Sequence, residues 1–320
     1  MSSAPEPTGT RVFVTGGTGA IGGHVIPALV REGHTVTALA RTPEKAAVLT
    51  AQGATAVSVS LFDRSALTAA FAGHDAVVNL ATAIPPMTRF MSVKATRNNE
   101  RIRTEGSSAV VDAALAAGVG RVLQESVSMF YRDQGARWID EDAPTDEFPM
   151  ARGNVAAEAG AHRFSEAGGT GTVLRFGLFY GPGAAHSEQM FAQARHHIGL
   201  VLGRPDAYTS SIHLSDAAAA VVAALSAPAG TFNIVDDEPL TKRGYADALA
   251  RAADRTMWLR GPGRAAFVLG DRLTSLTRSL RVGNARFRTA TGWAPEFPSA
   301  REGWIATAKA LTRGTAHPGR

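Results

Sequence analysis

Short apolar runs alternate with longer amphipathic stretches along the first 180 residues. Six runs have the length and composition of buried strands: residues 11–15, 35–40, 56–60, 76–80, 121–125 and 172–176. The stretches between them, including 20–32, 65–71 and about 98–117, have the length and spacing of helices, and Asp63 is the expected N-cap of the second. Strands alternating with helices predict an α/β fold in which a doubly wound parallel sheet is covered by crossover helices.

The regular alternation loosens in the second half of the chain. Short strands are predicted at 211–214 and 232–235, with a helix at 216–225 between them and Asp216 as its N-cap. The C-terminal part is predicted to hold an amphipathic helix, a break at 261–263 and a further helix.

This change of pattern divides the chain into two units. The sheet domain is expected to comprise residues 10–180 plus about 211–240, and a smaller C-terminal lobe residues 181–210 plus 241–320. Residues 1–9 are expected to be a disordered polar tail. The core of the smaller lobe is predicted to contain Trp258, Trp293 and Trp304.

Composition narrows the class of protein. The 320 residues include no cysteine, which excludes disulfides, thiolate metal ligands and cysteine nucleophiles and agrees with a cytoplasmic location. The net charge of +5 comes from scattered arginines, so no nucleic-acid partner is expected. No segment reaches the ~18 consecutive apolar residues of a membrane-spanning helix, and the first residues lack the apolar core of a signal peptide, so no membrane association is expected.

The first predicted strand runs directly into a glycine-rich turn, residues 15–22 (TGGTGAIG). Glycines at this point allow a tight turn and let main-chain amides approach a pyrophosphate, which the positive end of the following helix also attracts. We therefore predict a dinucleotide-binding (Rossmann) fold. The residues of the turn expected to bind the cofactor are Gly16, Thr18, Gly19, Ala20, Ile21 and Gly22.

Arg41 follows the second predicted strand, some 20 residues beyond the glycines. An NAD site usually carries an acidic residue there, which binds the ribose hydroxyls. Because an arginine can instead pair with a 2′-phosphate, Arg41 favours NADP, with NAD as the alternative cofactor. The other interpretations of Arg41 are stacking on the adenine and a position in solvent.

Six ordered segments resemble the short-chain dehydrogenase/reductase superfamily, in its extended or atypical branch of NAD-dependent epimerase/dehydratase type. They are residues 15–23 (TGGTGAIGG), 77–82 (VVNLAT), 118–131 (GVGRVLQESVSMFY), 173–183 (VLRFGLFYGPG), 211–225 and 230–241. The resemblance implies further cofactor contacts: Ser60 and Leu61 at the adenine, Leu80, Ala81 and Thr82 at the centre, and Phe176, Gly177 and Leu178 beside the nicotinamide. Ser60 stands where the family has an aspartate.

The usual catalytic pair of this superfamily is missing. Members commonly use Tyr-x-x-x-Lys, in which the lysine lowers the pKa of the tyrosine and binds ribose. The matching positions are Met150 and Asn154, no lysine lies between Lys94 and Lys242, and no tyrosine has a lysine four residues later. A thioether cannot usefully transfer a proton. We therefore expect Met150 to contact the substrate and Asn154 to hydrogen-bond the cofactor ribose.

Three other side chains are candidates for proton transfer. Ser126 and Tyr131 match a serine and a tyrosine of the family's fifth-strand segment, while Glu125 interrupts an apolar strand near its C-terminal end, where doubly wound folds bind ligands. A buried carboxyl has a raised pKa and can act as acid or base. The structural alternatives are Glu125 paired with an arginine such as Arg103 or Arg121, and Tyr131 as a packed ring with a satisfied hydroxyl.

His186 lies in the loop after YGPG, where extended members hold substrate, and is the predicted substrate contact, with a surface position as the alternative. His196 and His197 are adjacent on a predicted helix, so their rings diverge and no metal site is expected.

Together these residues predict an NADP-dependent oxidoreductase. It would transfer a hydride between nicotinamide and a small organic carbonyl, enone or sugar-like substrate, with a non-standard proton donor. One alternative is a non-redox epimerase, dehydratase or cyclase that retains its nucleotide, and the other is a non-catalytic NADP-binding sensor. The resemblance also implies a possible homodimer.

Overall fold

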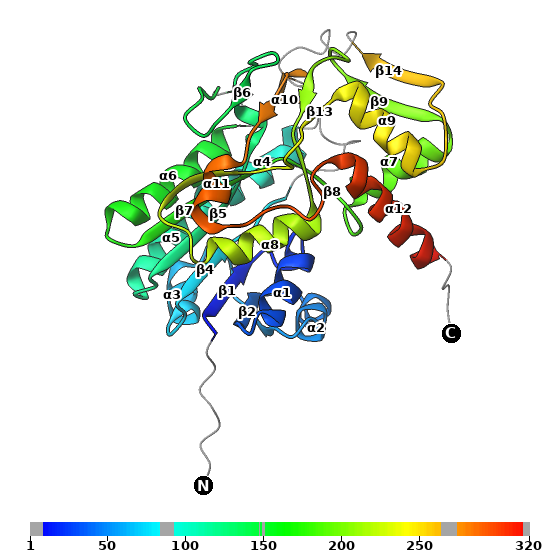
Figure 1. The fold of residues 1–320 in the computed structure, drawn as a ribbon. Helices are drawn as coiled ribbons and strands as arrows, with labels where there is room; N and C mark the ends of the chain where they lie inside the picture. The colour runs from blue at the N-terminus through cyan, green and yellow to red at the C-terminus, as the bar shows by residue number, and fades with distance from the viewer. Residues whose placement is uncertain (1–8, 84–92, 147, 149–150, 264–273, 316–320) are drawn as a thin grey trace.

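The computed structural model describes residues 9–83, 93–146, 148, 151–263 and 274–315. Its central feature is a parallel sheet of seven strands in the order β12-β7-β5-β4-β1-β2-β3 (Figure 1). The chain returns from β3 at one edge to β4 beside β1, as in doubly wound folds. The strands are β1 (Arg11–Thr15), β2 (Thr35–Leu39), β3 (Thr55–Val57), β4 (Ala76–Asn79), β5 (Arg121–Val127), β7 (Thr170–Phe176) and β12 (Gly230–Ile234).

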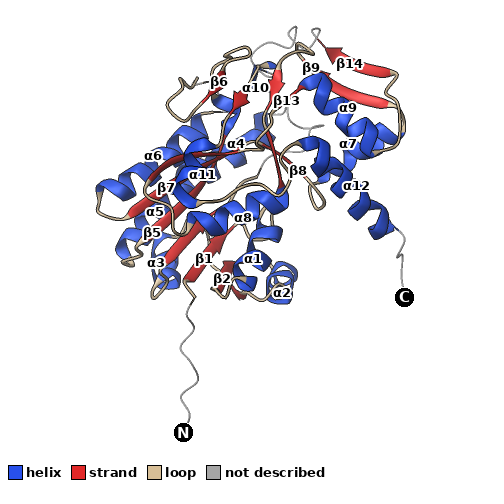
Figure 2. Cartoon of the chain, in the orientation of Figure 1, coloured by secondary structure: helices blue, strands red, loops and turns tan. Residues whose placement is uncertain are grey.

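Helices cover both faces of this sheet (Figure 2). One set is α1 (Gly22–Arg31), α2 (Pro43–Ala51), α8 (Leu214–Ala224) and α11 (Ala285–Thr291). The other is α3 (Arg64–Phe71), α4 (Val93–Arg101), a π-helical turn (Ile102–Gly106), α5 (Ser107–Ala116) and α6 (Arg152–Glu166). In β1, Val12 and Val14 belong to the apolar cluster on the face covered by the first set of helices, and Phe13 belongs to the apolar cluster on the opposite face. Burial on both faces explains why the strand is apolar throughout, and the predicted fold class is confirmed.

The remaining elements lie to one side of the sheet (Figure 1). Four two-stranded pairings join β8 (Leu178–Tyr180) with β11 (Ser211–His213), β9 (Ile198–Leu202) with β14 (Leu259–Gly263), β10 (Tyr208–Thr209) with β13 (Leu240–Thr241), and β6 (Trp138–Ile139) with β15 (Arg281–Val282). The helices here are α7 (Ala185–Arg195), α9 (Lys242–Ala252), α10 (Thr274–Thr277) and α12 (Ala300–Thr315). Their apolar cluster includes Tyr180, Tyr245 and Trp304. The division into a sheet domain and a smaller lobe stays a prediction.

Two local predictions about helices have different outcomes. Asp63 caps α3 as predicted, because its side chain accepts a hydrogen bond from the Ala66 amide. Asp216 does not cap α8: the cap is His213, whose side chain accepts from the Ser215 amide. Asp216 instead accepts hydrogen bonds from the amides of residues 296 and 297. These residues are 80 and 81 positions away, so no local sequence pattern predicts the contact.

Of the other predictions in the second half, those for residues 261–263 and for Trp258 were wrong. Residues 261–263 are not a break but the end of β14, where Pro262 is tolerated because β14 has only β9 as a partner. Trp258 lies outside the core: its side chain is 78% exposed and stacks on His197. Trp293 packs in the cluster against the sheet, whereas Trp304 is buried, as predicted, in the cluster that also contains Tyr180 and Tyr245.

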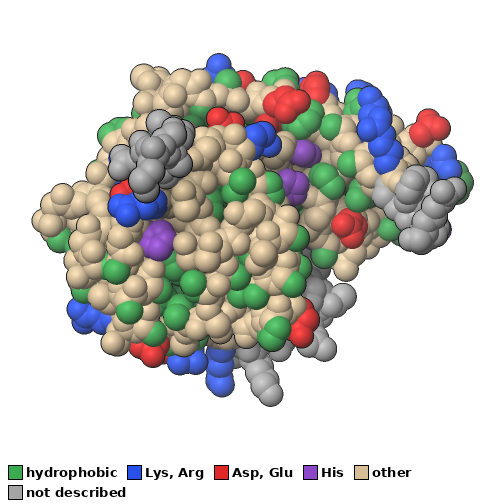
Figure 3. Space-filling view, turned by 90° about the horizontal axis from the view of Figure 1, so that it is seen from below, with side chains coloured by type: hydrophobic (Ala, Val, Ile, Leu, Met, Phe, Trp, Pro, Cys, Tyr) green, Lys and Arg blue, Asp and Glu red, His purple; other side chains and the backbone are tan. Residues whose placement is uncertain are grey.

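Charged side chains of both signs are interspersed on the face of the molecule that is shown in Figure 3. Among the described helices, none combines the length and apolar character that crossing a membrane requires.

Candidate functional site

The glycine-rich turn joins β1 to α1 at the carboxyl edge of the sheet. Gly16 has a φ of 72°, and a Cβ there would lie 2.4 Å from the carbonyl oxygen of Leu80, just after β4. A Cβ on Gly22 would lie 2.4 Å from the Gly16 carbonyl oxygen. Both positions therefore require glycine for the turn to close this tightly.

The beginning of α1 is suited to an anion. No side chain caps this helix and its first turn contains no acidic residue, so the positive end of its dipole is not compensated by a carboxylate of its own. The amides of Gly23 and His24 already donate to the carbonyl oxygens of Gly19 and Ile21. Gly19 and Ala20 are exposed and Thr18 is half-buried, while Ile21 is buried in the sheet cluster. These residues fit the pyrophosphate of a dinucleotide.

The predicted adenine-end residues lie after β2 and β3. Arg41 is exposed and makes no ion pair or hydrogen bond to another described residue, so its guanidinium can reach a ligand. Ser60 is exposed and its Oγ accepts from the Phe62 amide. Leu61 is half-buried and packs against Gly106, where a Cβ would lie 2.8 Å from Leu61 Cδ2.

Other predicted cofactor residues follow β4 and β7. Ala81 and Thr82 are half-buried at the end of β4. Phe176 is completely buried in the sheet cluster, so only its main chain can pass beside a ligand. Leu178 is half-buried, and a Cβ on Gly177 would lie 2.9 Å from the Ser210 carbonyl oxygen. Gly177 therefore permits the close approach of the segment before β11.

A row of buried, hydrogen-bonded polar side chains connects the carboxyl ends of β1 and β4 with the middle of β5. Thr15 Oγ1 donates to Asn79 Oδ1 (2.5 Å), and Asn79 Nδ2 donates to Gln124 Oε1 (2.8 Å). Buried polar groups need such partners. This row of side chains explains why Gln124 interrupts an apolar strand, and the sequence analysis singled out neither Thr15 nor Asn79 as its partner.

Two of the three proton-transfer candidates belong to one buried cluster. Ser126 Oγ donates to Glu158 Oε1 (2.6 Å), and Arg175 pairs with both oxygens of that carboxylate through Nε (2.9 Å) and Nη2 (2.7 Å). Arg175 Nη1 donates to the Tyr131 hydroxyl (2.8 Å), which donates to Asn233 Oδ1 (2.8 Å). Ser126 and Tyr131 are both 0% exposed. The hydroxyl of each is therefore already engaged inside the protein.

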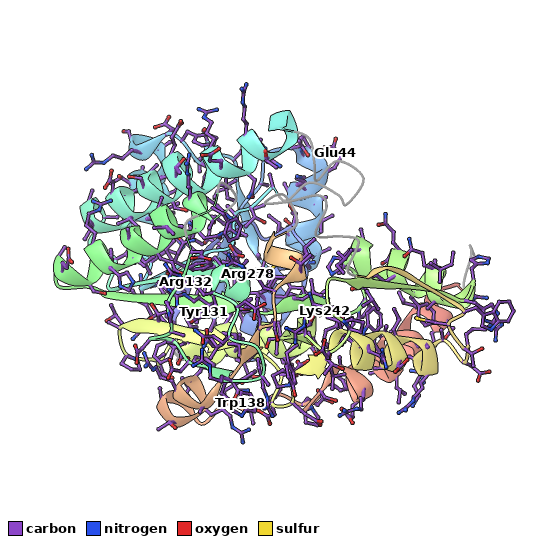
Figure 4. The ribbon with its side chains drawn as sticks, turned by 90° about the horizontal axis from the view of Figure 1, so that it is seen from above. Glu44, Tyr131, Arg132, Trp138, Lys242 and Arg278 are labelled. Carbon is purple, nitrogen blue, oxygen red and sulfur yellow. The ribbon has the colours of Figure 1, made fainter. Side chains whose placement is uncertain are left out.

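Tyr131 is also held through its main chain. Arg278 Nη1 donates to the Tyr131 carbonyl oxygen (2.8 Å), and the two residues lie close together in Figure 4. Burial raises the pKa of Tyr131 to about 12, even though Arg175 acts in the opposite direction. A phenol with that pKa keeps its proton at neutral pH and is a poor general base.

The third candidate, Glu125, pairs with Arg103. Arg103 Nη2 lies 2.9 Å from Glu125 Oε1 and 2.8 Å from Oε2, and the two side chains are each 3% exposed. Burial raises the pKa of Glu125, and Arg103 counteracts this effect. Of the two partners suggested by the sequence, the structure selects Arg103. Arg121 donates instead to the carbonyl oxygens of Ala224 and Ala227.

The sequence analysis missed Glu158, Arg175 and Asn233. The sequence could have identified Arg175, because a charged residue inside an apolar strand (TVLRF) requires a partner. The indication for Glu158 was weaker: it shares a buried helix face with Asn154 and Ala161. Nothing in the sequence indicated Asn233, since its contact with Tyr131 spans 102 residues.

The remaining predicted residues are placed as follows. Asn154 lies on the buried face of α6 and is 6% exposed. His186 lies on α7, and its Nε2 is within hydrogen-bonding distance of the Phe179 carbonyl oxygen. Met150 lies outside the described residues. Within the described part of the chain, no group of His, Asp and Glu side chains is arranged to hold a metal ion.

Comparison with known proteins extends this picture. The model of the NAD dependent epimerase/dehydratase family matches residues 12–234. A 3-diazoavenalumate denitrifying reductase from Streptomyces sp is 34% identical over 307 residues, which cover 92% of this chain and 98% of that protein. Human epimerase family protein SDR39U1, solved with NADPH, has a TM-score of 0.76 at 22% identity over 93% of this chain and 99% of that one. UDP-glucose 4-epimerase from Thermotoga maritima, solved with UDP-glucose, has a TM-score of 0.78 at 20% identity over 96% of this chain and 100% of that one.

Proposed function

The chain belongs to the NAD-dependent epimerase/dehydratase family, and from this we propose that it is an NADP-dependent reductase that needs no proton from its own side chains. Membership makes it an NAD(P)-dependent oxidoreductase or an epimerase-like enzyme, as the six segments predicted. The observation that carries the choice of a reductase without a proton donor is the burial of Ser126, Tyr131 and Glu125, which are 0%, 0% and 3% exposed. The two hydroxyls are hydrogen-bonded inside the protein, and Glu125 is ion-paired with Arg103.

Different residues of the site bind different parts of the dinucleotide. The glycine turn and the beginning of α1 hold the pyrophosphate, and Arg41 pairs with the 2′-phosphate. When bound, the reduced nicotinamide supplies a hydride. Asn154 lies on the buried face of α6 and hydrogen-bonds the ribose hydroxyls, while His186 of α7 contacts the substrate.

The substrate class follows from the burial and engagement of the three predicted proton-transfer candidates, Ser126, Tyr131 and Glu125. A carbonyl that accepts a hydride becomes an alkoxide, which must then be protonated. An arenediazonium carbon needs no proton: a C–H bond forms, the C–N bond breaks and its electron pair leaves with dinitrogen. The Streptomyces relative is named for a diazo compound and for its denitrification. We therefore propose aromatic diazo compounds as the substrates, in preference to the carbonyl, enone or sugar-like compounds.

Arg41→Ala is expected to lower the affinity for NADPH about tenfold or more and to leave the affinity for NADH unchanged, because only NADPH has the charged partner. Calorimetric titration of both cofactors measures this. Arg31→Ala is the matched control, since Arg31 is 72% exposed in the last turn of α1. Equal losses for the two cofactors would instead place Arg41 against the adenine.

Tyr131→Phe is expected to keep turnover per folded enzyme within about threefold while lowering the free energy of unfolding by about 1–3 kcal/mol, because Arg175 and Asn233 lose a hydrogen-bond partner. Steady-state kinetics with a carboxylated arenediazonium salt and urea titration measure the two effects. Tyr208→Phe serves as the control, because its hydroxyl makes no hydrogen bond to another described residue. A tenfold loss of turnover at unchanged NADPH affinity would make Tyr131 the proton donor after all.

A further inference from the structure

Arg103 is a buried cation with an unused hydrogen-bond donor. It is 2% exposed, and a single nitrogen, Nη2, makes both of its contacts with Glu125: a hydrogen bond to Oε1 and an ion-pair contact with Oε2, which itself has no hydrogen-bond partner. Its other terminal nitrogen, Nη1, is buried and has no hydrogen-bond partner among the described residues. An unpaired buried charged donor is costly, so its retention calls for an explanation such as a ligand.

The position of Arg103 indicates which part of a ligand it would meet. It lies on the π-helical turn between α4 and α5, a distortion often found at functional sites. A Cβ on Gly153 would lie 2.9 Å from Arg103 Cβ, so glycine at 153 lets the first turn of α6 approach Arg103 beside Asn154. Its partner Glu125 lies in the C-terminal half of β5.

Strand order places β5 in the second half of the doubly wound sheet. The pyrophosphate turn follows β1, and Arg41 follows β2 on one side of it. The strands β4 and β5 lie on the other side of β1. A dinucleotide spans both halves, so its nicotinamide ribose comes over β4 and β5.

The distribution of lysine and arginine side chains also favours Arg103 as the residue that binds the ligand. No lysine lies between Lys94 and Lys242, so no ammonium group from that stretch can reach this end of the site. The other buried arginine of the region, Arg175, already uses Nε, Nη1 and Nη2 on Glu158, Tyr131 and the Glu141 carbonyl oxygen. Of these two buried arginines, Arg103 is therefore the one that retains a donor for a ligand.

We propose that Arg103 Nη1 donates a hydrogen bond to a hydroxyl oxygen of the nicotinamide ribose and is thus a cofactor-binding residue. Glu125 then orients the guanidinium and balances its charge when the site is empty of ligand. This inference rests on the proposed NADP site. In this proposal Arg103 binds the nicotinamide ribose of the cofactor, and Arg41 binds the 2′-phosphate at its other end.

Titration with whole and partial cofactor tests this assignment. The variant is Arg103→Met combined with Glu125→Leu, because a buried pair replaced by apolar residues avoids an unpaired charge. Its affinity for NADPH is expected to fall about tenfold, whereas its affinity for 2′,5′-ADP, which has no nicotinamide ribose, is expected to stay unchanged. Arg103→Lys is the second variant. It retains a cation opposite Glu125 but lacks the forked donor, so the same selective loss is expected.

The control is Arg121→Met, at the other end of β5, which is expected to bind both ligands as the unaltered protein does. Circular dichroism establishes that each variant is folded. Unchanged NADPH affinity in either folded Arg103 variant would overturn the role of Arg103 alone. An unaltered protein that binds neither ligand would overturn the NADP site and this inference together.

Discussion

Glu158→Ala is expected to lower the free energy of unfolding by about 3–5 kcal/mol, which urea titration measures. The change leaves Arg175, 8% exposed, as an uncompensated buried charge and removes the acceptor of Ser126 Oγ. The same loss would loosen Tyr131, because Arg175 also donates to its hydroxyl. The cluster therefore stabilises the sheet beneath the candidate site.

Two variants distinguish this effect from a general sensitivity of α6. Glu166→Ala changes an exposed residue at the end of the same helix and is expected to alter stability by less than about 0.5 kcal/mol. Replacing both members of the pair, Glu158→Leu with Arg175→Met, is expected to be far less harmful than removing the carboxylate alone. Loss of turnover without loss of stability in Glu158→Ala would assign the cluster to catalysis instead.

Gly22→Ala is expected to weaken NADPH binding by about 100-fold or more, since the methyl group would displace the Gly16 carbonyl and several amide contacts with it. A Cβ at this position would lie 2.4 Å from that oxygen and 2.6 Å from two atoms of Gly17. The turn would have to open, which removes the geometry that holds the pyrophosphate.

The adjacent residue provides a matched control. A Cβ on Gly23 would have no heavy atom nearer than Gln52 Nε2, at 3.9 Å. Gly23→Ala is therefore expected to retain NADPH affinity and to stabilise α1 by about 0.5–1 kcal/mol. Fluorescence titration of both variants with NADPH compares them. Equal affinities for Gly22→Ala and Gly23→Ala would mean that the cofactor does not use this turn.

The features that could be predicted from the sequence are those that neighbouring residues determine. Strand β1 ends at Thr15 as predicted, because its apolar run gives way to glycines whose freedom the turn requires. The order of strands and helices follows from the same local patterns. Arg41 follows β2, as the apolar pattern predicted, and its contact with the 2′-phosphate stays a prediction.

The features that could not be predicted depend on contacts between distant residues. Pairing of β14 with β9 turns a proline-glycine segment into a strand, although nothing local favours one. The partners of Asp216 are 80 and 81 residues away. Likewise, the sequence offered Arg103 and Arg121 as partners for Glu125, and only the folded structure, in which the Arg103 side chain reaches Glu125, decides between them.

The most direct test of the proposed function is to determine where the hydride of NADPH is transferred. NADPH deuterated at one or the other face of C4 is incubated with the protein and a carboxylated arenediazonium salt, and mass spectrometry locates the label. We expect one deuterium on the ring carbon that carried the diazo group, from one labelled face only, together with release of dinitrogen. Absence of deuterium from the product, or label found only when a carbonyl compound replaces the diazonium salt, would contradict the proposed function.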